Sequence, residues 1–164
     1  MRKLGNSPRR LLLFVLVIGI PICASAGTEQ ARVLKGIKTL SVNIQLTNTV
    51  QEQGLLEEEY KVQTELKLRM AGIQISDTAE TQCLIRINST RGGGAYNISV
   101  GIGEPVTLVR NPNFVFTATI WMIDTVGTAI QNSLVQNSLR ERVKVRLSDL
   151  LDSFLNDYLS VNPK

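Results

Sequence analysis

Three groups of residues could carry chemistry, and each also has a structural interpretation. The acidic triplet Glu57–Glu59 lies in a predicted helix, where consecutive side chains point about 100° apart, so the carboxylates cannot converge on one metal ion. The glycine-rich run 91–94 could hold a phosphate through backbone N–H groups, yet it joins two predicted strands and opens no helix. Cys83 stands in an apolar alternation, which predicts a buried thiol and not a reactive one.

The sequence contains few other residues or motifs that are typical of a catalytic site. The chain contains no histidine, so the usual general base and the commonest metal ligand are missing. It also lacks the P-loop and nucleophile-elbow motifs. We therefore expect no catalytic residue, no metal site and no cofactor. An enzyme that works through carboxylate and Arg side chains is the third hypothesis for function.

The strand region favours a binding surface over a catalytic site. In the alternating run 114–122, Trp121 has the opposite parity from the two phenylalanines, so we expect it to face away from the helices. Our hypothesis is that the uncovered sheet face around Trp121 and Thr119 contacts a partner or an apolar ligand. The alternative is that Trp121 covers an edge or an end of the sheet. The complete candidate surface consists of Thr119, Trp121, Tyr96, Arg91 and Arg110.

The last quarter of the chain, residues 139–161, predicts a long amphipathic helix that needs a surface to pack on. Its apolar residues recur at steps of three and four, while acidic residues such as Asp152 and Asp157 are expected to turn mostly away. The apolar stripe consists of Leu139, Val143, Leu147, Leu150, Phe154, Tyr158 and Val161.

Alternating residues in the middle of the chain provide the expected docking surface. They predict strands at 40–46, 83–88, 96–102 and 114–122, with a turn at 124–127 and a short last strand from Thr128 to about Val135. A first helix is predicted from about Val50 to Ala71, ended by Gly72, and residues 27–35 are expected to be a loose lead-in. The predicted fold is therefore α+β, a two-layer sandwich. It has a mostly antiparallel sheet of four to five strands and two helices packed on one face, in β-α-β-β-β-α order.

The first 26 residues predict a secretory signal peptide that is cleaved before Gly27, leaving residues 27–164 as a single α+β domain. A basic start precedes the apolar run Leu11–Ile20, and Ala24-Ser25-Ala26 forms a cleavage site. Four of the 18 basic residues lie in this segment and all 14 acidic residues lie beyond it, so the mature chain is formally neutral. A basic nucleic-acid surface and a transmembrane span of the mature chain are therefore not expected.

The closing residues Asp152 to Lys164, with the ending FLNDYLSVNPK, resemble the C-terminus of small uncharacterised secreted bacterial proteins. The order of elements is loosely similar to periplasmic domains of the TolB amino-terminal and LPS-assembly-lipoprotein kind. Such resemblance implies an envelope location and an assembly role. The first functional hypothesis is thus a non-enzymatic periplasmic or secreted protein that binds another envelope component. The alternative is a soluble carrier of a lipid or other apolar ligand between helices and sheet. The partner and the oligomeric state stay open.

Overall fold

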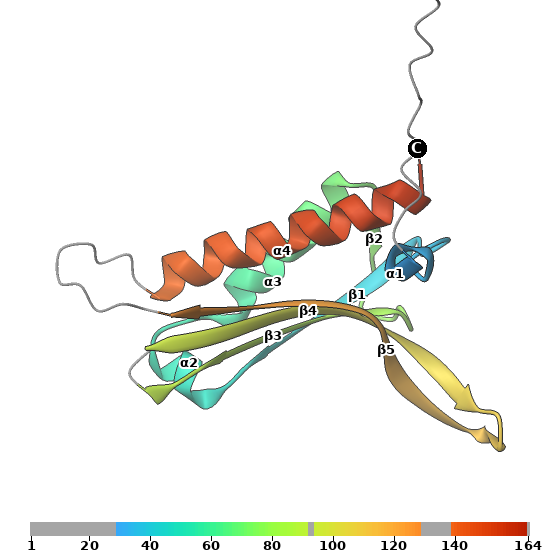
Figure 1. The fold of residues 1–164 in the computed structure, drawn as a ribbon, viewed down its shortest axis with the longest axis horizontal. Helices are drawn as coiled ribbons and strands as arrows, with labels where there is room; N and C mark the ends of the chain where they lie inside the picture. Colours follow the sequence, from blue (N-terminus) through green and yellow to red (C-terminus); the bar gives the residue numbers. More distant parts are fainter. Residues whose placement is uncertain (1–28, 92–93, 129–138, 164) are drawn as a thin grey trace, which may run out of the picture.

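The computed structural model describes residues 29–91, 94–128 and 139–163 (Figure 1). The predicted signal peptide and most of the predicted strand from Thr128 to Val135 lie outside these residues. The elements in chain order are α1 (Glu29–Arg32), β1 (Thr39–Leu46), α2 (Asn48–Glu52), α3 (Glu57–Met70), β2 (Gln74–Ile75), β3 (Gln82–Ser89), β4 (Ala95–Leu108), β5 (Asn111–Thr128) and α4 (Leu139–Val161).

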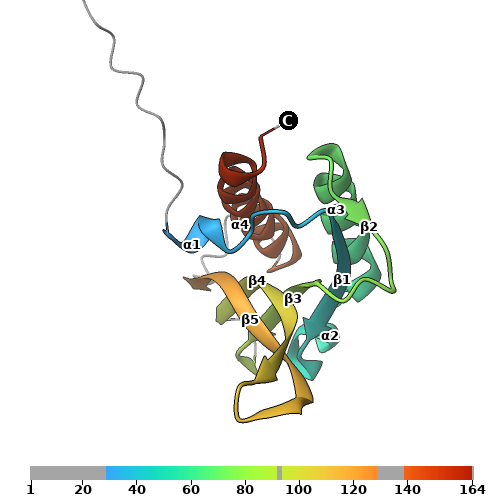
Figure 2. The ribbon, with the colours of Figure 1, turned by 90° about the vertical axis from the view of Figure 1, so that its right-hand side faces the viewer.

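The strands form one five-stranded sheet in the order β2-β1-β3-β4-β5. β1 pairs in parallel with β2 and β3, whereas β3, β4 and β5 form an antiparallel meander. The helices α3 and α4 lie side by side over one face of this sheet (Figures 1 and 2). The predicted α+β class, with a mostly antiparallel sheet and two main helices on one face, is confirmed.

The predicted C-terminal helix is confirmed with the same bounds, Leu139–Val161. Its stripe packs on β4 and β5, and Leu151 and Leu155 are buried beside it, which widens the apolar face. Phe154 is fully buried against Trp121 and Tyr158. The hydroxyl of Tyr158 donates to the Ile37 carbonyl at 2.8 Å, which ties the helix to the chain before β1.

Two acidic residues of α4 that lie off its apolar stripe contact side chains of α3 and β5. Asp152 lies 2.7 Å from the Nζ of Lys67, which also donates to the carbonyl and hydroxyl of Ser148. Asp157 accepts a hydrogen bond from the indole N–H of Trp121 at 3.1 Å. Both carboxylates lie off the apolar stripe, as predicted, and Asp152 is 60% exposed, but long side chains on α3 and β5 reach round to them.

The predicted first helix is divided into two by a turn. Gly54 has a φ of +81°, which a side chain would oppose, and the chain restarts as α3 at Glu57. The spacing of Leu55, Val62 and Leu66 predicts one apolar side, but only Leu55 is buried, and Val62 and Leu66 are 57% and 59% exposed. The buried side chains of α3 are Tyr60, Thr64 and Leu68. The predicted stop at Gly72 is confirmed by its φ of 93° directly after the C-cap Ala71.

Thr64 is fully buried, and none of the described residues offers its hydroxyl a hydrogen-bond partner. An unsatisfied buried hydroxyl keeps its desolvation cost. We expect Thr64→Val, which keeps the shape and removes the hydroxyl, to raise the free energy of unfolding by about 1 kcal/mol in urea titrations. Thr64→Ser keeps the hydroxyl and deletes the methyl group, so it should lower that free energy. A Thr64→Val protein less stable than the wild type would contradict this assignment.

The alternating strands are confirmed where they form the centre of the sheet. Cys83, Ile85 and Ile87 of β3 are fully buried, and so are Ile98 and Val100 of β4. The lead-in was not loose, because α1 forms there and Ala31 and Leu34 are fully buried. The predicted turn at 124–127 was wrong as well, since β5 continues to Thr128 in register with β4.

Burial makes the Cys83 thiol inert, as its alternation predicted. Desolvation raises the pKa of Cys83 from its ordinary value of 9.0 to about 12. Since the folded state keeps this proton more tightly than the unfolded state, the contribution of Cys83 to stability is complete below pH 9 and is lost as the pH rises toward 12. We expect Ellman's reagent to label Cys83 only as fast as the protein unfolds, and to label it at once in denaturing urea. Rapid labelling of the native protein would contradict the burial.

Candidate functional site

A two-stranded arm projects from the end of the sheet. β3 begins at Gln82, opposite Gly103 of β4, while β4 and β5 remain paired beyond this point as far as the turn between Leu108 and Asn111. We call residues 104–119 the β4–β5 arm. In both views it extends away from α3 and α4 (Figures 1 and 2). Pro105 lies in the arm, where β4 has no strand on its other side, and such an edge is one of the few places in a sheet that tolerate proline.

The arm exposes several large apolar side chains. Phe114 and Phe116 are 52% and 39% exposed, and their ring centroids lie 6.0 Å apart. Phe116 pairs across the strands with Val106, while Val115 pairs with Thr107 on the other face. Since side chains alternate along a strand, the arm has one face built mainly from phenylalanine and aliphatic residues and another that is rich in threonine. The phenylalanines were expected in the core, but no helix extends over this part of the sheet.

The arm also has unpaired strand edges. β5 is the last strand of the sheet, and β4 has lost β3 on its other side from Glu104 onward. Nearer the core, the side chain of Gln30 donates to the Met122 carbonyl and Arg142 donates to the Thr128 carbonyl. From Asn111 to Ile123 the sequence of β5 contains no charged residue. Natural edge strands are often protected by charges, and this one lacks that protection.

A β-bulge separates the arm from the core and reverses the parity of β5. Ile102 pairs with Trp121, but the next residue, Gly103, pairs with Thr119, so Ile120 is an extra residue in β5. Trp121 consequently turns toward the helices, where it is only 2% exposed and lies 5.1 Å from Phe154 between ring centroids. The prediction that Trp121 faces away from the helices was therefore wrong.

The five candidate residues do not form one surface. Tyr96 is buried on the helix-covered face, as Trp121 is. Thr119 lies on the uncovered face, in a shallow hollow that Met122 also lines. Arg91 is exposed at the end of the β3–β4 connection, and Arg110 is exposed at the turn of the arm. Of the five, only Thr119 and Arg110 lie in the β4–β5 arm.

The described residues offer no cluster of three or more His, Cys, Asp or Glu side chains that could hold a metal ion. In the same part of the chain, none of the helices has the length and apolar character needed to cross a membrane. The acidic triplet lies in the first turn of α3, where Glu59 accepts from Arg140 of α4 at 2.9 Å. Glu59 thus joins α3 to α4.

Comparison with known proteins concerns the fold. No protein-family model and no curated protein sequence matches the chain. Solved structures similar to it include a PelC dodecamer from Paraburkholderia phytofirmans, at 16% identity and a TM-score of 0.41, covering 75% of this chain and 86% of that chain. An uncharacterised protein matches at 10% identity and a TM-score of 0.40, covering 76% of this chain and 92% of that chain.

The rare lipoprotein B from Shewanella oneidensis matches at 14% identity and a TM-score of 0.27, covering 74% of this chain and 96% of that chain. At these identities we transfer no residue role and no function from any of the three proteins.

Proposed function

We propose that this protein is a non-enzymatic binding or assembly protein of the cell envelope, periplasmic or secreted, and that it contacts another protein through the β4–β5 arm. The observation that carries the proposal is the projecting pair of exposed phenylalanines, Phe114 and Phe116, next to unpaired strand edges. Large exposed apolar patches on soluble proteins mark interaction sites. The envelope location rests on the predicted signal peptide.

A protein strand is the partner that fits the arm best. The outer edge of β5 presents backbone N–H and C=O groups, which another extended chain can pair with by adding a strand. A two-stranded ribbon alone is only marginally stable in water, so a third strand would also stabilise the arm. Anionic lipid headgroups fit less well, because β5 has no basic residue in the uncharged stretch from Asn111 to Ile123.

The carrier hypothesis has less support from the interior of the fold. A lipid held between helices and sheet needs an apolar space there, but that layer is filled by side chains with no exposed surface. Examples are Leu147 and Phe154 from α4 and Ile98 and Val100 from β4. Lipid in organic extracts of the purified protein, in stoichiometric amount, would favour the carrier over the assembly protein.

The test replaces the aromatic residues of the arm and measures how much of a crosslinked partner protein is captured. The protein is crosslinked in the native envelope, and the captured protein is identified with the wild type. We expect the double variant Phe114→Ser with Phe116→Ser to reduce this capture at least about tenfold, since aromatic residues are typical binding hot spots. Their side chains already contact solvent, so the melting temperature should change little.

The matched control is Val62→Ser with Leu66→Ser on α3, where the two side chains are exposed to a similar extent. This variant removes apolar surface of the same kind from the helix layer and should leave capture unchanged. Equal capture by the wild type and the arm variant would overturn the proposal. Equal loss in both variants would do so too, because it would indicate general stickiness.

A further inference from the structure

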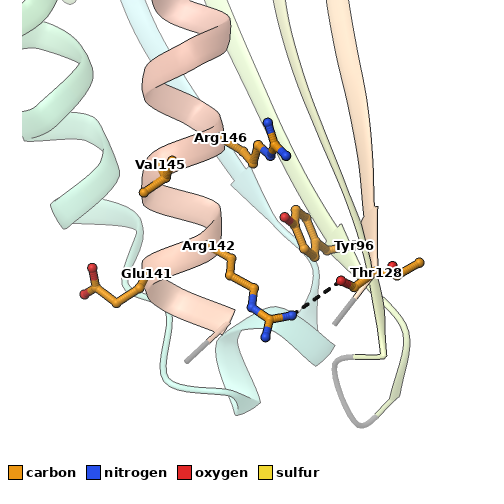
Figure 3. Close-up of a pocket in the computed structure, with 6 residues that line it drawn as sticks. All are labelled: Tyr96, Thr128, Glu141, Arg142, Val145 and Arg146. Atoms are coloured by element: carbon orange, nitrogen blue, oxygen red, sulfur yellow. Dashed lines mark hydrogen bonds between the residues drawn. The ribbon is translucent and has the colours of Figure 1, made fainter. Parts of the chain in front are cut away.

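A second candidate site lies away from the arm, between the first half of α4 and the ends of β4 and β5. A cleft of about 500 Å³ opens there (Figure 3). Arg142, Val145 and Arg146 line it from α4, and Tyr96 and Thr128 line it from the strands. Tyr96 is only 5% exposed, so its ring is a fixed wall of the cleft.

Two guanidinium groups enter this cleft from one side of α4. Arg142 and Arg146 are one helical turn apart, so both extend toward the strands, with the Tyr96 ring between them (Figure 3). Arg142 donates to the Thr128 carbonyl at 3.4 Å, which uses one of its five N–H groups. No other described residue accepts a hydrogen bond from the Arg142 side chain, so within the described part of the chain most of its donors remain for a ligand.

Nearby carboxylates neutralise these arginines only weakly. Arg146 lies 3.5 Å from Asp149, but both side chains are more than half exposed, and such surface pairs contribute little. Glu141 also lines the cleft, although its carboxylate lies on the other side of α4 from both guanidinium groups (Figure 3). The cleft thus presents net positive charge next to an aromatic wall.

We propose that this cleft binds the oxyanion of a small ligand, a carboxylate or a phosphate group, between Arg142 and Arg146. Guanidinium groups recognise both oxyanions through paired N–H donors, and this geometry is why Arg is so common in such sites. The body of the ligand then lies against the Tyr96 ring and Val145, which favours a compact apolar or aromatic group. The site is separate from the β4–β5 arm and does not depend on the function proposed for it.

Isothermal titration of the mature protein tests the site with three probes of similar size. Phenyl phosphate and benzoate carry the two oxyanions, and benzyl alcohol is the neutral analogue. We expect saturable binding of at least one anion, no binding of benzyl alcohol, and weaker binding as salt increases. The relative affinities of phenyl phosphate and benzoate distinguish a phosphate ligand from a carboxylate ligand. Inorganic phosphate should then compete with the anion that binds.

Arg146→Gln should weaken this binding about tenfold or more, because it removes charged hydrogen bonds to the ligand. Arg142→Gln should have a similar effect, but it also removes the hydrogen bond to the Thr128 carbonyl. Arg146 makes no such bond, so a loss in the Arg146 variant reports on ligand binding alone. The matched control is Lys144→Gln, which removes the same charge from the same exposed helix but does not line the cleft. An equal loss in the Lys144 variant would indicate general charge attraction and overturn the proposal. No saturable binding of either anion would overturn it as well.

Discussion

Phe154→Ala is expected to lower the free energy of unfolding by about 3–5 kcal/mol, the largest effect of any single substitution considered for this protein. Phe154 has no exposed surface and lies at the centre of the contact between α4 and the sheet. Its ring meets Trp121 edge-on, at 5.1 Å and 63°, and lies 6.1 Å from the ring of Tyr158. Truncation therefore removes an aromatic cluster and leaves a cavity that its rigid neighbours cannot fill.

Urea denaturation followed by circular dichroism measures the change in stability, and fluorescence reports on the site because Trp121 is the only tryptophan. The native emission of Trp121 should move to longer wavelength as water reaches the cavity beside it. Leu159→Ala is the control on the same helix, since Leu159 is 36% exposed and truncation there should cost about 1 kcal/mol or less. Equal urea midpoints for the two variants would contradict the assigned face of α4.

The parts of the fold that sequence patterns predicted are those in which one periodicity runs without interruption. The helix Leu139–Val161 keeps its apolar stripe for its whole length, and its bounds were predicted correctly. In β3 and in the first half of β4, a strand is covered on one face only, so alternate residues are buried. In such segments a single rule, burial of one face, determines the structure.

Predictions failed where a local irregularity changes the phase of the pattern. One extra residue at Ile120 turns Trp121 from the expected free face to the core, and nothing in the alternation of 114–122 marks that insertion. The turn at Gly54 similarly separates α2 from α3, so the single helix predicted from Val50 to Ala71 is two helices. Both errors arise from tertiary pairing that a single sequence does not display.

The candidate sites depend on the relative lengths of the strands and on how α4 packs against them. Neither can be derived from the sequence pattern. β3 has 8 residues, whereas β4 has 14 and β5 has 18, so the paired strands must project beyond the helices. Pro105 is the signal that the sequence offers, because proline within a strand is confined to sheet edges and bulges. The cleft beside Arg142 and Arg146 lies between α4 and the ends of β4 and β5. Tyr96 is far from both arginines in the sequence, so their spacing could not predict that they line the same cleft.

Gly127→Ala is expected to lower the free energy of unfolding by about 1–3 kcal/mol, although the change adds a single methyl group. Gly127 pairs across the strands with Tyr96, whose ring lies directly over it. A Cβ atom at this position would lie 2.1 Å from Cζ of Tyr96, far inside van der Waals contact. Since Tyr96 is 95% buried, its ring cannot move aside without displacing the core or narrowing the cleft next to Arg142 and Arg146.

Gly101→Ala is the matched control, because the added methyl group would meet its nearest neighbours at 3.4 Å, an ordinary contact. That variant should be neutral or slightly more stable, since alanine restricts the unfolded chain more than glycine does. A double-mutant cycle then identifies the cause of the loss at Gly127. In a Tyr96→Leu background the shorter side chain leaves room for the methyl group, so Gly127→Ala should cost less than half as much. Simple additivity of the two changes would show that the loss comes from the backbone of β5 and not from the tyrosine ring.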